Sequence, residues 1–250
     1  MTALTKGRYR VRFAETSEDV RAAQRLRYKA FLSDTNSADS AEGLDQDPFD
    51  DLCQHVLVED QSTGALVCCF RILPLSTGSE IFSSYSAQYY ELSALGDFEG
   101  PMVEVGRFCI DPDVSDPDIL RVAWGALTKY VDDHNVEMLF GCSSFRGTDE
   151  QAYADSFAVL RDRHLAPKRW LPTVKAPKVF QFAKKLRRKP DTKKASRLMP
   201  PLLKTYLMMG GWVSDHAVVD GHMNTLHVFT GLEIRTIPPA RKRLLRAVAG

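Results

Sequence analysis

The chain has 250 residues and a formal net charge of +1, and hydrophobic and charged residues make up 44% and 26% of it. These proportions are typical of a globular protein and exclude a disordered chain or a disulfide scaffold, and we expect no nucleic-acid partner. No stretch approaches the ~20 apolar residues that cross a bilayer, residues 1–13 lack an apolar signal core, and the five cysteines lie in apolar runs, so we expect a cytoplasmic protein.

Hydrophobic periodicity and capping residues predict alternating helices and strands in one α/β domain. Helices are expected at residues 17–31, 86–92, 117–134, 150–163 and 200–209, and strands at residues 9–13, 55–59, 65–73, 102–110, 138–145, 216–219 and 226–232. Residues 33–47 have no apolar period and are expected to form a long loop that carries function. The domain is expected to span residues 1–250, with a basic insertion at about 165–197 and a basic tail at about 238–250.

Charge is distributed unevenly along the chain. No Lys or Arg lies between Lys29 and Arg71, and this interval contains nine acidic residues. Basic residues gather instead in a segment that contains Lys184, Lys185, Arg187, Arg188 and Lys189. A second group lies in the C-terminal tail. The sequence therefore predicts one acidic patch and two basic patches.

Glu104 is the most informative single residue, because a carboxylate in an apolar strand costs free energy unless it is paired or serves a purpose. Arg107 lies three positions away, so a regular strand would place the two side chains on opposite faces unless Gly106 forms a bulge. Such a bulge would expose the backbone N–H groups of Val105, Gly106 and Phe108 to a thioester oxyanion, while Glu104 accepts a proton from an attacking amine. A structural ion pair at a strand end is the alternative interpretation.

Four separated motifs, in their order and spacing, resemble the acyl-homoserine-lactone synthase branch of the acetyltransferase-like (GNAT) fold. They are Leu26-Arg27-Tyr28 with Phe31, Asp47-Pro48-Phe49-Asp50, Phe70-Arg71-Ile72-Leu73 and Glu104-Val105-Gly106-Arg107-Phe108. Further segments are similar to the ornithine N-acyltransferases that make lyso-ornithine lipid, and these include residues 49–55, 140–145 and 198–204, Val218-Val219-Asp220, and Asn224-Thr225. The resemblance covers residues 26–232.

This resemblance implies a GNAT-like α/β fold with a mixed, mostly antiparallel central sheet flanked by helices. It also implies the transfer of a 3-hydroxyacyl chain from acyl carrier protein to the α-amine of L-ornithine, with Glu104 as the base and Arg107 beside it. Only the free amine is nucleophilic, and near neutral pH an α-amine is largely protonated, so the reaction needs a positioned base. No metal or bound cofactor is expected, because the acyl group arrives on the 4'-phosphopantetheine arm of the carrier.

The donor is expected to be carrier-bound for a second reason. Members of the fold that use coenzyme A bind its pyrophosphate in an Arg/Gln-x-x-Gly-x-Gly/Ala loop, and residues 111–120 lack this loop. The carrier is acidic in the families resembled, so the basic segment Lys184, Lys185, Arg187, Arg188 and Lys189 is expected to steer docking. A solvated surface loop is the alternative interpretation of the same residues.

Ornithine's side-chain ammonium needs a carboxylate, and the leading candidates are Asp47 and Asp50, which stand where the resemblance places the paired acids of the synthases. Asp220 is a third candidate. Arg27 and Arg71 are expected to hold Asp50 or Glu104 in place, or to bind the carboxylate of ornithine.

Several further features carry less weight. His227 stands where the resemblance leads us to expect an acid, and the spacing of His216, His222 and His227 fits no compact zinc pattern. Cys109 and Cys142 lie in predicted core strands and are interpreted as packing groups. Residues 238–249 alternate basic and apolar residues, as expected for either a helix that touches a membrane peripherally or a plain surface helix.

Two rival functions remain open at this point. An acyl-homoserine-lactone synthase would share the four motifs, but the C-terminal third, including Asp220 with Asn224-Thr225, favours the ornithine enzymes. A non-catalytic module that binds carrier protein or membrane would have no need of Glu104 within the complete set of motifs.

Overall fold

The computed structural model describes residues 4–33 and 42–249. The chain forms two compact units, of which unit 1 comprises Met1–Pro74, Val103–Val136 and Pro238–Gly250, and unit 2 comprises Leu75–Met102 and Glu137–Ile237. The expectation of one domain stays a prediction. Each unit has its own run of sheet and its own helices, so each is described by itself.

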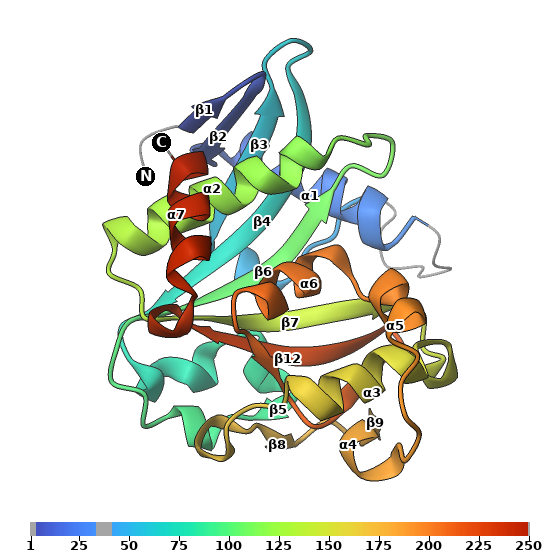
Figure 1. Cartoon of the computed structure of the whole chain (residues 1–250). Coiled ribbons are helices and arrows are strands. Elements are labelled where there is room, and N and C mark those ends of the chain that lie inside the picture. Colours follow the sequence, from blue (N-terminus) through green and yellow to red (C-terminus); the bar gives the residue numbers. More distant parts are fainter. Residues whose placement is uncertain (1–3, 34–41, 250) are drawn as a thin grey trace. The chain divides into compact units, whose positions relative to one another are not determined.

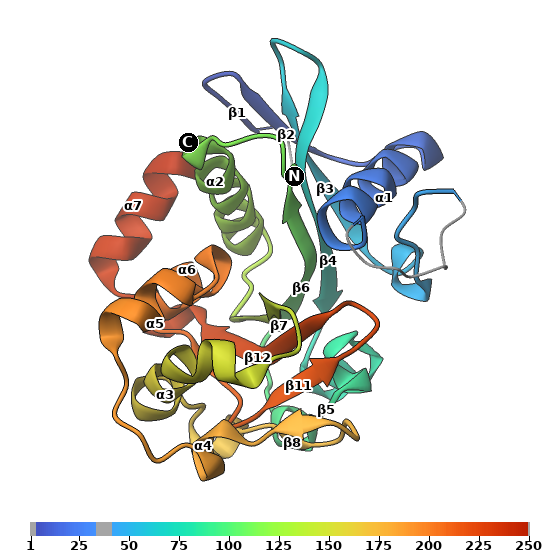
Figure 2. The same ribbon diagram turned by 90° about the vertical axis from the view of Figure 1, so that its right-hand side faces the viewer.

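Unit 1 is an antiparallel sheet between helices. Its strands are β1 (Leu4–Lys6), β2 (Tyr9–Phe13), β3 (Gln54–Asp60), β4 (Ala65–Leu75) and β6 (Met102–Ile110), and its helices are α1 (Ser17–Phe31), the 3-10 helix η1 (Pro48–Asp50), α2 (Pro117–Asp133) and α7 (Pro239–Ala249). The strand order is β1-β2-β3-β4-β6, and the first four strands pair antiparallel. Helix α1 covers one face of this sheet, and α2 and α7 lie on the other (Figure 2).

Local sequence explains where the helices of unit 1 begin. Thr16 and Asp19 form a capping box at the start of α1, and α2 starts at Asp116, whose side chain accepts the Asp118 N–H ahead of Pro117 at the first helical position. On its inner face, α1 buries Ala23 and Leu26 against the sheet. Caps and apolar periodicity thus agree, which is why both helices match the predicted ranges closely.

Helix α7 packs on α2. Arg246 pairs with Asp132 at 2.9 Å, and a Cβ on Gly125 would lie 2.8 Å from Cγ1 of Val248, so the two helices approach closely at this glycine. Leu244 remains 60% exposed. The basic tail is therefore a helix held against the protein, and its contact with a membrane stays a prediction. Among the described helices, none combines the length and apolar content that spanning a bilayer requires.

Unit 2 is built around β7 and β12, which pair antiparallel over nine residues (Figure 1). Its strands are β5 (Tyr90–Glu91), β7 (Met138–Arg146), β8 (Thr173–Val174), β9 (Val179–Phe180), β10 (Trp212–Val213), β11 (Ala217–Asp220) and β12 (Thr225–Glu233). Its α-helices are α3 (Ala154–Arg163), α4 (Phe182–Lys185), α5 (Thr192–Leu198) and α6 (Pro201–Met208). Its 3-10 helices are η2 (Gly78–Ser83), η3 (Ser86–Gln88), η4 (Ser93–Leu95), η5 (Glu150–Tyr153), η6 (Lys168–Trp170) and η7 (Ile234–Thr236). The strand order is β7-β12-β11-β9, β10 also pairs with β12, and β5 pairs with β8.

The two faces of the β7-β12-β11 sheet differ in chemistry. Phe145, Leu226 and Val219 alternate onto one face, where Phe145 and Leu226 join the apolar core around Phe157 of α3. The register places Asp220, opposite Thr225, and His227, opposite Val218, on the other face. Because buried Val218 and Phe229 share the face of Asp220 and His227, unit 2 has one apolar sheet face and one face that mixes polar and apolar side chains.

The predicted α/β class with a mostly antiparallel sheet flanked by helices is confirmed. The expected helix at residues 86–92 is wrong, because η3 ends at Gln88 and Tyr90–Glu91 pairs with β8 instead. The basic insertion at 165–197 contains β8, β9, α4 and α5. Two-residue strands have no periodicity of their own, and their pairing depends on partners distant in sequence.

Phe157 tests the core of unit 2. We expect Phe157→Ala to lower the free energy of unfolding by about 3–5 kcal/mol, because the fully buried ring would leave a cavity. The matched control is Phe82→Ala, since Phe82 is 60% exposed and its removal should change stability by less than about 0.5 kcal/mol. Chemical denaturation measures both, and equal effects would contradict the assigned core.

Candidate functional site

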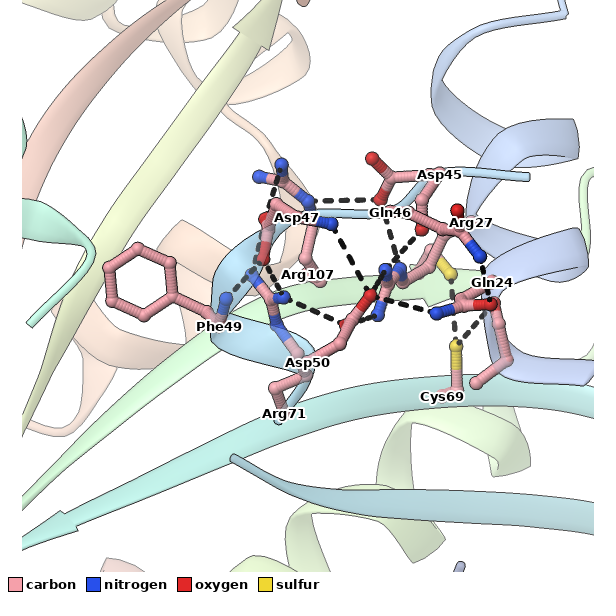
Figure 3. Close-up of polar contacts among 12 residues, drawn as sticks. Gln24, Arg27, Asp45, Gln46, Asp47, Phe49, Asp50, Cys69, Arg71 and Arg107 are labelled. Carbon is pink, nitrogen blue, oxygen red and sulfur yellow. Dashed lines mark hydrogen bonds and ion pairs between the residues drawn. The ribbon is translucent and has the colours of Figure 1, made fainter. Parts of the chain in front are cut away.

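Three arginines and three aspartates of unit 1 form a closed ring of ion pairs, which we call the Arg/Asp ring (Figure 3). Around the ring the order is Arg27, Asp45, Arg107, Asp47, Arg71 and Asp50, and Asp50 closes it on Arg27. Cations and anions alternate, so every carboxylate lies between two guanidinium groups. The formal charges of the six residues cancel.

Asp45 and Asp47 each bridge two arginines. Oδ2 of Asp45 accepts from Nε of Arg27 at 2.9 Å and from Nε of Arg107 at 3.0 Å. Oδ2 of Asp47 accepts from Nη2 of Arg107 at 3.0 Å and from Nη2 of Arg71 at 3.0 Å, and its Oδ1 accepts from Nη1 of Arg71 at 2.5 Å. The contact between Arg71 and Asp47 is thus bidentate, which is the strong geometry for a guanidinium and a carboxylate.

Asp50 completes the ring with the largest number of contacts. It accepts from both Nη atoms of Arg27, at 2.7 and 3.0 Å, and from Nη1 of Arg71 at 2.9 Å. Nε2 of Gln24 donates to it at 2.9 Å. Arg27 and Arg71 therefore both hold Asp50, as the sequence suggested.

The ring fixes a short loop to three distant elements. Its arginines come from α1, β4 and β6, whereas its aspartates all come from one short segment that includes η1. Asp47 is the N-cap of η1 and accepts the Phe49 N–H at 2.9 Å, and Pro48 follows at the first helical position. The predicted acidic patch is therefore partly wrong, because three of its acids are neutralised by arginines.

The ion pairs of the ring are buried, so each charge depends on its partners in place of water. The side chains of Arg27 and Arg71 are 1% and 3% exposed. Burial disfavours ionised Asp50, but hydrogen bonds and charges from Arg27, Gln24 and Arg71 outweigh it and hold the pKa of Asp50 below its usual range. The same balance between burial and Arg71 lowers the pKa of Asp47. Asp47 and Asp50 are therefore ionised near neutral pH, and Nε of Arg71 has no acceptor within the described residues.

Arg107 has an unusual backbone conformation. Its φ is +50°, within strand β6, and Gly106 is absent from the described residues with positive φ. The irregularity expected at Gly106 thus falls one residue later, on a side chain that Asp45 and Asp47 hold at two points. A left-handed non-glycine residue costs on the order of 1–3 kcal/mol and persists where its surroundings enforce it. The ring supplies that enforcement.

Glu104 lies on the same strand and is 4% exposed. The pKa of the nearby Cys53 thiol is raised to about 11, chiefly by burial, with Arg71 lowering it and Glu104, Asp47 and Asp50 raising it. Glu104 is therefore near the ring. Val105, Gly106 and Phe108, the predicted oxyanion segment, flank Arg107 on β6.

The other predicted residues belong to unit 2. Asp220 ends β11 and is 7% exposed. The five basic residues at 184–189 all have exposed side chains, and Arg188 also pairs with buried Asp155 at 2.8 Å.

Sequence reasoning missed the role of Asp45. Asp45 is one of the nine acids between Lys29 and Arg71, and its position two residues before Asp47 is the only local signal that it belongs with the motif. Gln24 was also missed, although it lies one helical turn before Arg27 and therefore on the same face of α1.

The discounted thiols and histidines have ordinary packing partners. Cys109 contacts Cys69 at 3.5 Å between sulfurs, and this contact, then burial, raises the pKa of Cys109, which suits a packing thiol. His216 contacts Asp215, and His227 contacts Tyr90. Across residues 4–33 and 42–249, no three His, Cys, Asp or Glu side chains gather in a way that would hold a metal ion.

The comparisons with known proteins identify the domain and the relatives of the chain. An acetyltransferase (GNAT) domain model matches residues 26–125, which contain the whole ring. An L-ornithine N(alpha)-acyltransferase from Rhodobacter capsulatus is 33% identical over 88% of this chain and 88% of its own length. A protein of the same name from Brucella abortus is 29% identical over 92% of this chain and 86% of its own length.

Two solved structures share the fold. FeeM, an N-acyl amino acid synthase from uncultured soil microbes, has a TM-score of 0.50 at 12% identity and covers 92% of this chain and 94% of its own. A coenzyme-A-dependent acyl-homoserine lactone synthase has a TM-score of 0.50 at 13% identity, with 94% and 83% covered. At these identities the likeness concerns the fold alone.

Arg27 tests the ring. We expect Arg27→Ala to lower the free energy of unfolding by about 3–5 kcal/mol, because two buried carboxylates lose a partner. Arg25→Ala on the same helix is the control, since Arg25 is 50% exposed and its pair with Glu18 should contribute less than about 0.5 kcal/mol. A loss below about 1 kcal/mol for Arg27→Ala in urea titrations would contradict the structural role of the ring.

Proposed function

We infer the function from family membership: the chain belongs to the L-ornithine N(alpha)-acyltransferase family, and we propose that it transfers a 3-hydroxyacyl group from acyl carrier protein to the α-amine of L-ornithine, giving lyso-ornithine lipid. The observation that carries the proposal is 33% identity over 88% of both chains. The acyl-homoserine-lactone synthases, the rival from the sequence, share with this chain a fold at much lower identity.

The proposed chemistry is direct aminolysis of a thioester. The nitrogen of the α-amine attacks the thioester carbonyl, the new C–N bond forms, the C–S bond breaks, and the carrier's thiol leaves. Glu104 accepts the proton that the amine loses, and the departing thiolate takes up one proton, from protonated Glu104 or through water, so that the carboxylate is restored and no net proton is released. A carboxylate that is 4% exposed and lies within an apolar strand suits a base that acts out of contact with bulk water.

The segment around Arg107 suits the carbonyl oxygen. Arg107 has a left-handed backbone within β6, and such a residue interrupts the regular alternation of a strand. Successive backbone N–H groups around a left-handed residue can form a concave anion-binding site. We propose that the N–H groups of Val105, Gly106 and Phe108 bind the developing oxyanion. Arg107 acts as the positioning residue that sets their direction.

The end of β6 supports a carrier-bound donor. Where coenzyme-A-using members of the fold bind a pyrophosphate, this chain has Asp111, Asp113 and Asp116 before α2. Asp116 itself caps the helix N-terminus, and Pro117 removes one N–H, so neither charge nor donors favour a phosphate there. Lys29 pairs with Asp111 and Asp113, which reduces but does not reverse this negative charge.

Carrier docking is proposed for the exposed basic segment of unit 2. Lys184, Lys185, Arg187 and Lys189 present cationic heads to solvent, while Arg188 is also held by Asp155. Such a segment attracts an acidic carrier protein and raises the association rate. The reaction is proposed to take place in the cytoplasm, with α7 and its exposed Leu244 as the contact to the membrane that receives the product.

The function is tested with purified protein and 3-hydroxyacyl carrier protein. Ornithine should release thiol and give a product with the mass of the N-acylated amino acid, and the same acyl group on coenzyme A should react at least about tenfold more slowly because of the acids before α2. Thiol release no faster than in a control without amine would overturn the substrate assignment. Equal rates with both donors would overturn the carrier assignment alone.

Glu104→Gln tests the base. Turnover should fall by about 10²–10⁴-fold, because the amide has nearly the same shape but cannot accept a proton. Glu18→Gln, at an exposed position of α1, should keep normal turnover. Single-turnover thiol release is the measurement. If Glu104→Gln kept near-normal rates across the pH range, Glu104 would not be the base, although the acyltransferase assignment would survive.

A further inference from the structure

Apart from Glu104, the buried carboxylates other than Asp220 each pair with an arginine. Asp45, Asp60, Asp155 and Glu233 do so at 2.9, 3.4, 2.8 and 2.8 Å respectively. Asp220 is 7% exposed, and the contact that its side chain makes in the described part of the chain is with a backbone N–H group, that of Met223. A buried carboxylate without a cation costs free energy, so this position is suited to a cation that the chain itself does not supply.

The structural task of Asp220 does not need its charge. Its Oδ1 accepts the Met223 N–H at 3.0 Å, in the turn between β11 and β12 where Asn224 has a φ of +48°. An asparagine makes the same turn with its side-chain oxygen, because only a hydrogen-bond acceptor is required. The turn therefore does not explain why residue 220 carries a negative charge.

Tyr89 provides an aromatic surface beside this charge. The Tyr89 ring lies 5.4 Å from that of Tyr85 and meets His227 edge-on at 5.0 Å, and the two tyrosine hydroxyls are 3.3 Å apart. Asp220 lies on the same sheet face as His227, the ring that Tyr89 contacts. Burial, then Tyr85, and then the charge of Asp220 raise the pKa of the Tyr89 phenol. A carboxylate beside an aromatic face is a combination that binds ammonium groups.

His227 is the residue against which the Tyr89 ring packs edge-on. It is 3% exposed, lies on the same sheet face as Asp220, and contacts the Tyr90 hydroxyl through Nδ1 at 3.2 Å. The Tyr90 hydroxyl also donates to the backbone carbonyl of His227 at 2.8 Å. The contacts with Tyr90 therefore hold the imidazole of His227 in place, and the imidazole in turn packs against the Tyr89 ring.

We propose that Asp220 and Tyr89 bind the side-chain ammonium of the acceptor amino acid. Asp220 supplies the counter-charge and Tyr89 the aromatic face, and His227 is the positioning residue behind it. This assignment rests on the proposed function and specifies which residues select a diamino acid over one with an apolar side chain.

The test compares two acceptors under saturating hydroxyacyl carrier protein: ornithine, and 2-aminopentanoic acid, which has the same carbon chain without the side-chain ammonium. In Asp220→Asn we expect kcat/KM for ornithine to fall on the order of 100-fold, while kcat/KM for 2-aminopentanoic acid changes less than about threefold. Tyr89→Leu should lower kcat/KM for ornithine about tenfold. Asp162→Asn, at a surface position of α3, is the control and should change neither value.

The outcomes separate this proposal from the function itself. If the unmodified enzyme acylated no ornithine, the proposed function would fall. If it did, but Asp220→Asn kept its preference for ornithine or lost both acceptors equally, the assignment of Asp220 would be overturned. Thermal unfolding of Asp220→Asn should match that of the parent protein, because the turn bond to Met223 is retained. Should this variant be unfolded, Tyr89→Leu decides, and an unchanged ornithine preference in it would equally overturn the proposal.

Discussion

The closed Arg/Asp ring is the interaction on which the architecture of unit 1 depends. Its three aspartates come from one short segment, whereas its arginines come from α1, β4 and β6. Because each carboxylate lies between two guanidinium groups, removing one member leaves two buried partners unbalanced. The ring therefore holds an otherwise irregular loop to the sheet and to the helix, and it does so with charges that cancel among themselves.

The ring also reaches the segment proposed for chemistry, through Arg107. Two ion pairs, to Asp45 and Asp47, hold this side chain while its backbone adopts a φ of +50° in the middle of β6. The strain of that conformation is localised next to the N–H groups proposed to bind the oxyanion and three residues from Glu104. Stability of the loop and orientation of the strand are thus two consequences of the same contacts.

The sequence predicted the long elements well, because caps and periodicity are local: the Asp116-Pro117 start of α2 and the whole of β6 match the structure. It also brought Arg27, Asp50 and Arg71 to attention through their motifs. It could not show that each aspartate is shared by two arginines, since the partners lie up to 62 residues apart, as for Asp45 and Arg107. Short strands such as Tyr90–Glu91 were missed for the same reason.

The candidate carboxylates for the acceptor now divide by their partners. Asp47 and Asp50 already accept from two guanidinium groups each, so an ammonium would have to displace an arginine and leave it buried without its pair. Asp220 has no such competitor within the described residues, and its one structural bond, to Met223, would be served equally by an amide. The resemblance led us to expect an acid at position 227, but His227 instead packs against the Tyr89 ring. The negative charge comes from Asp220, which lies on the same sheet face in the neighbouring strand β11. Acceptor recognition and the Arg/Asp ring are therefore assigned to different carboxylates, because only an unpaired charge has binding energy left to offer a substrate.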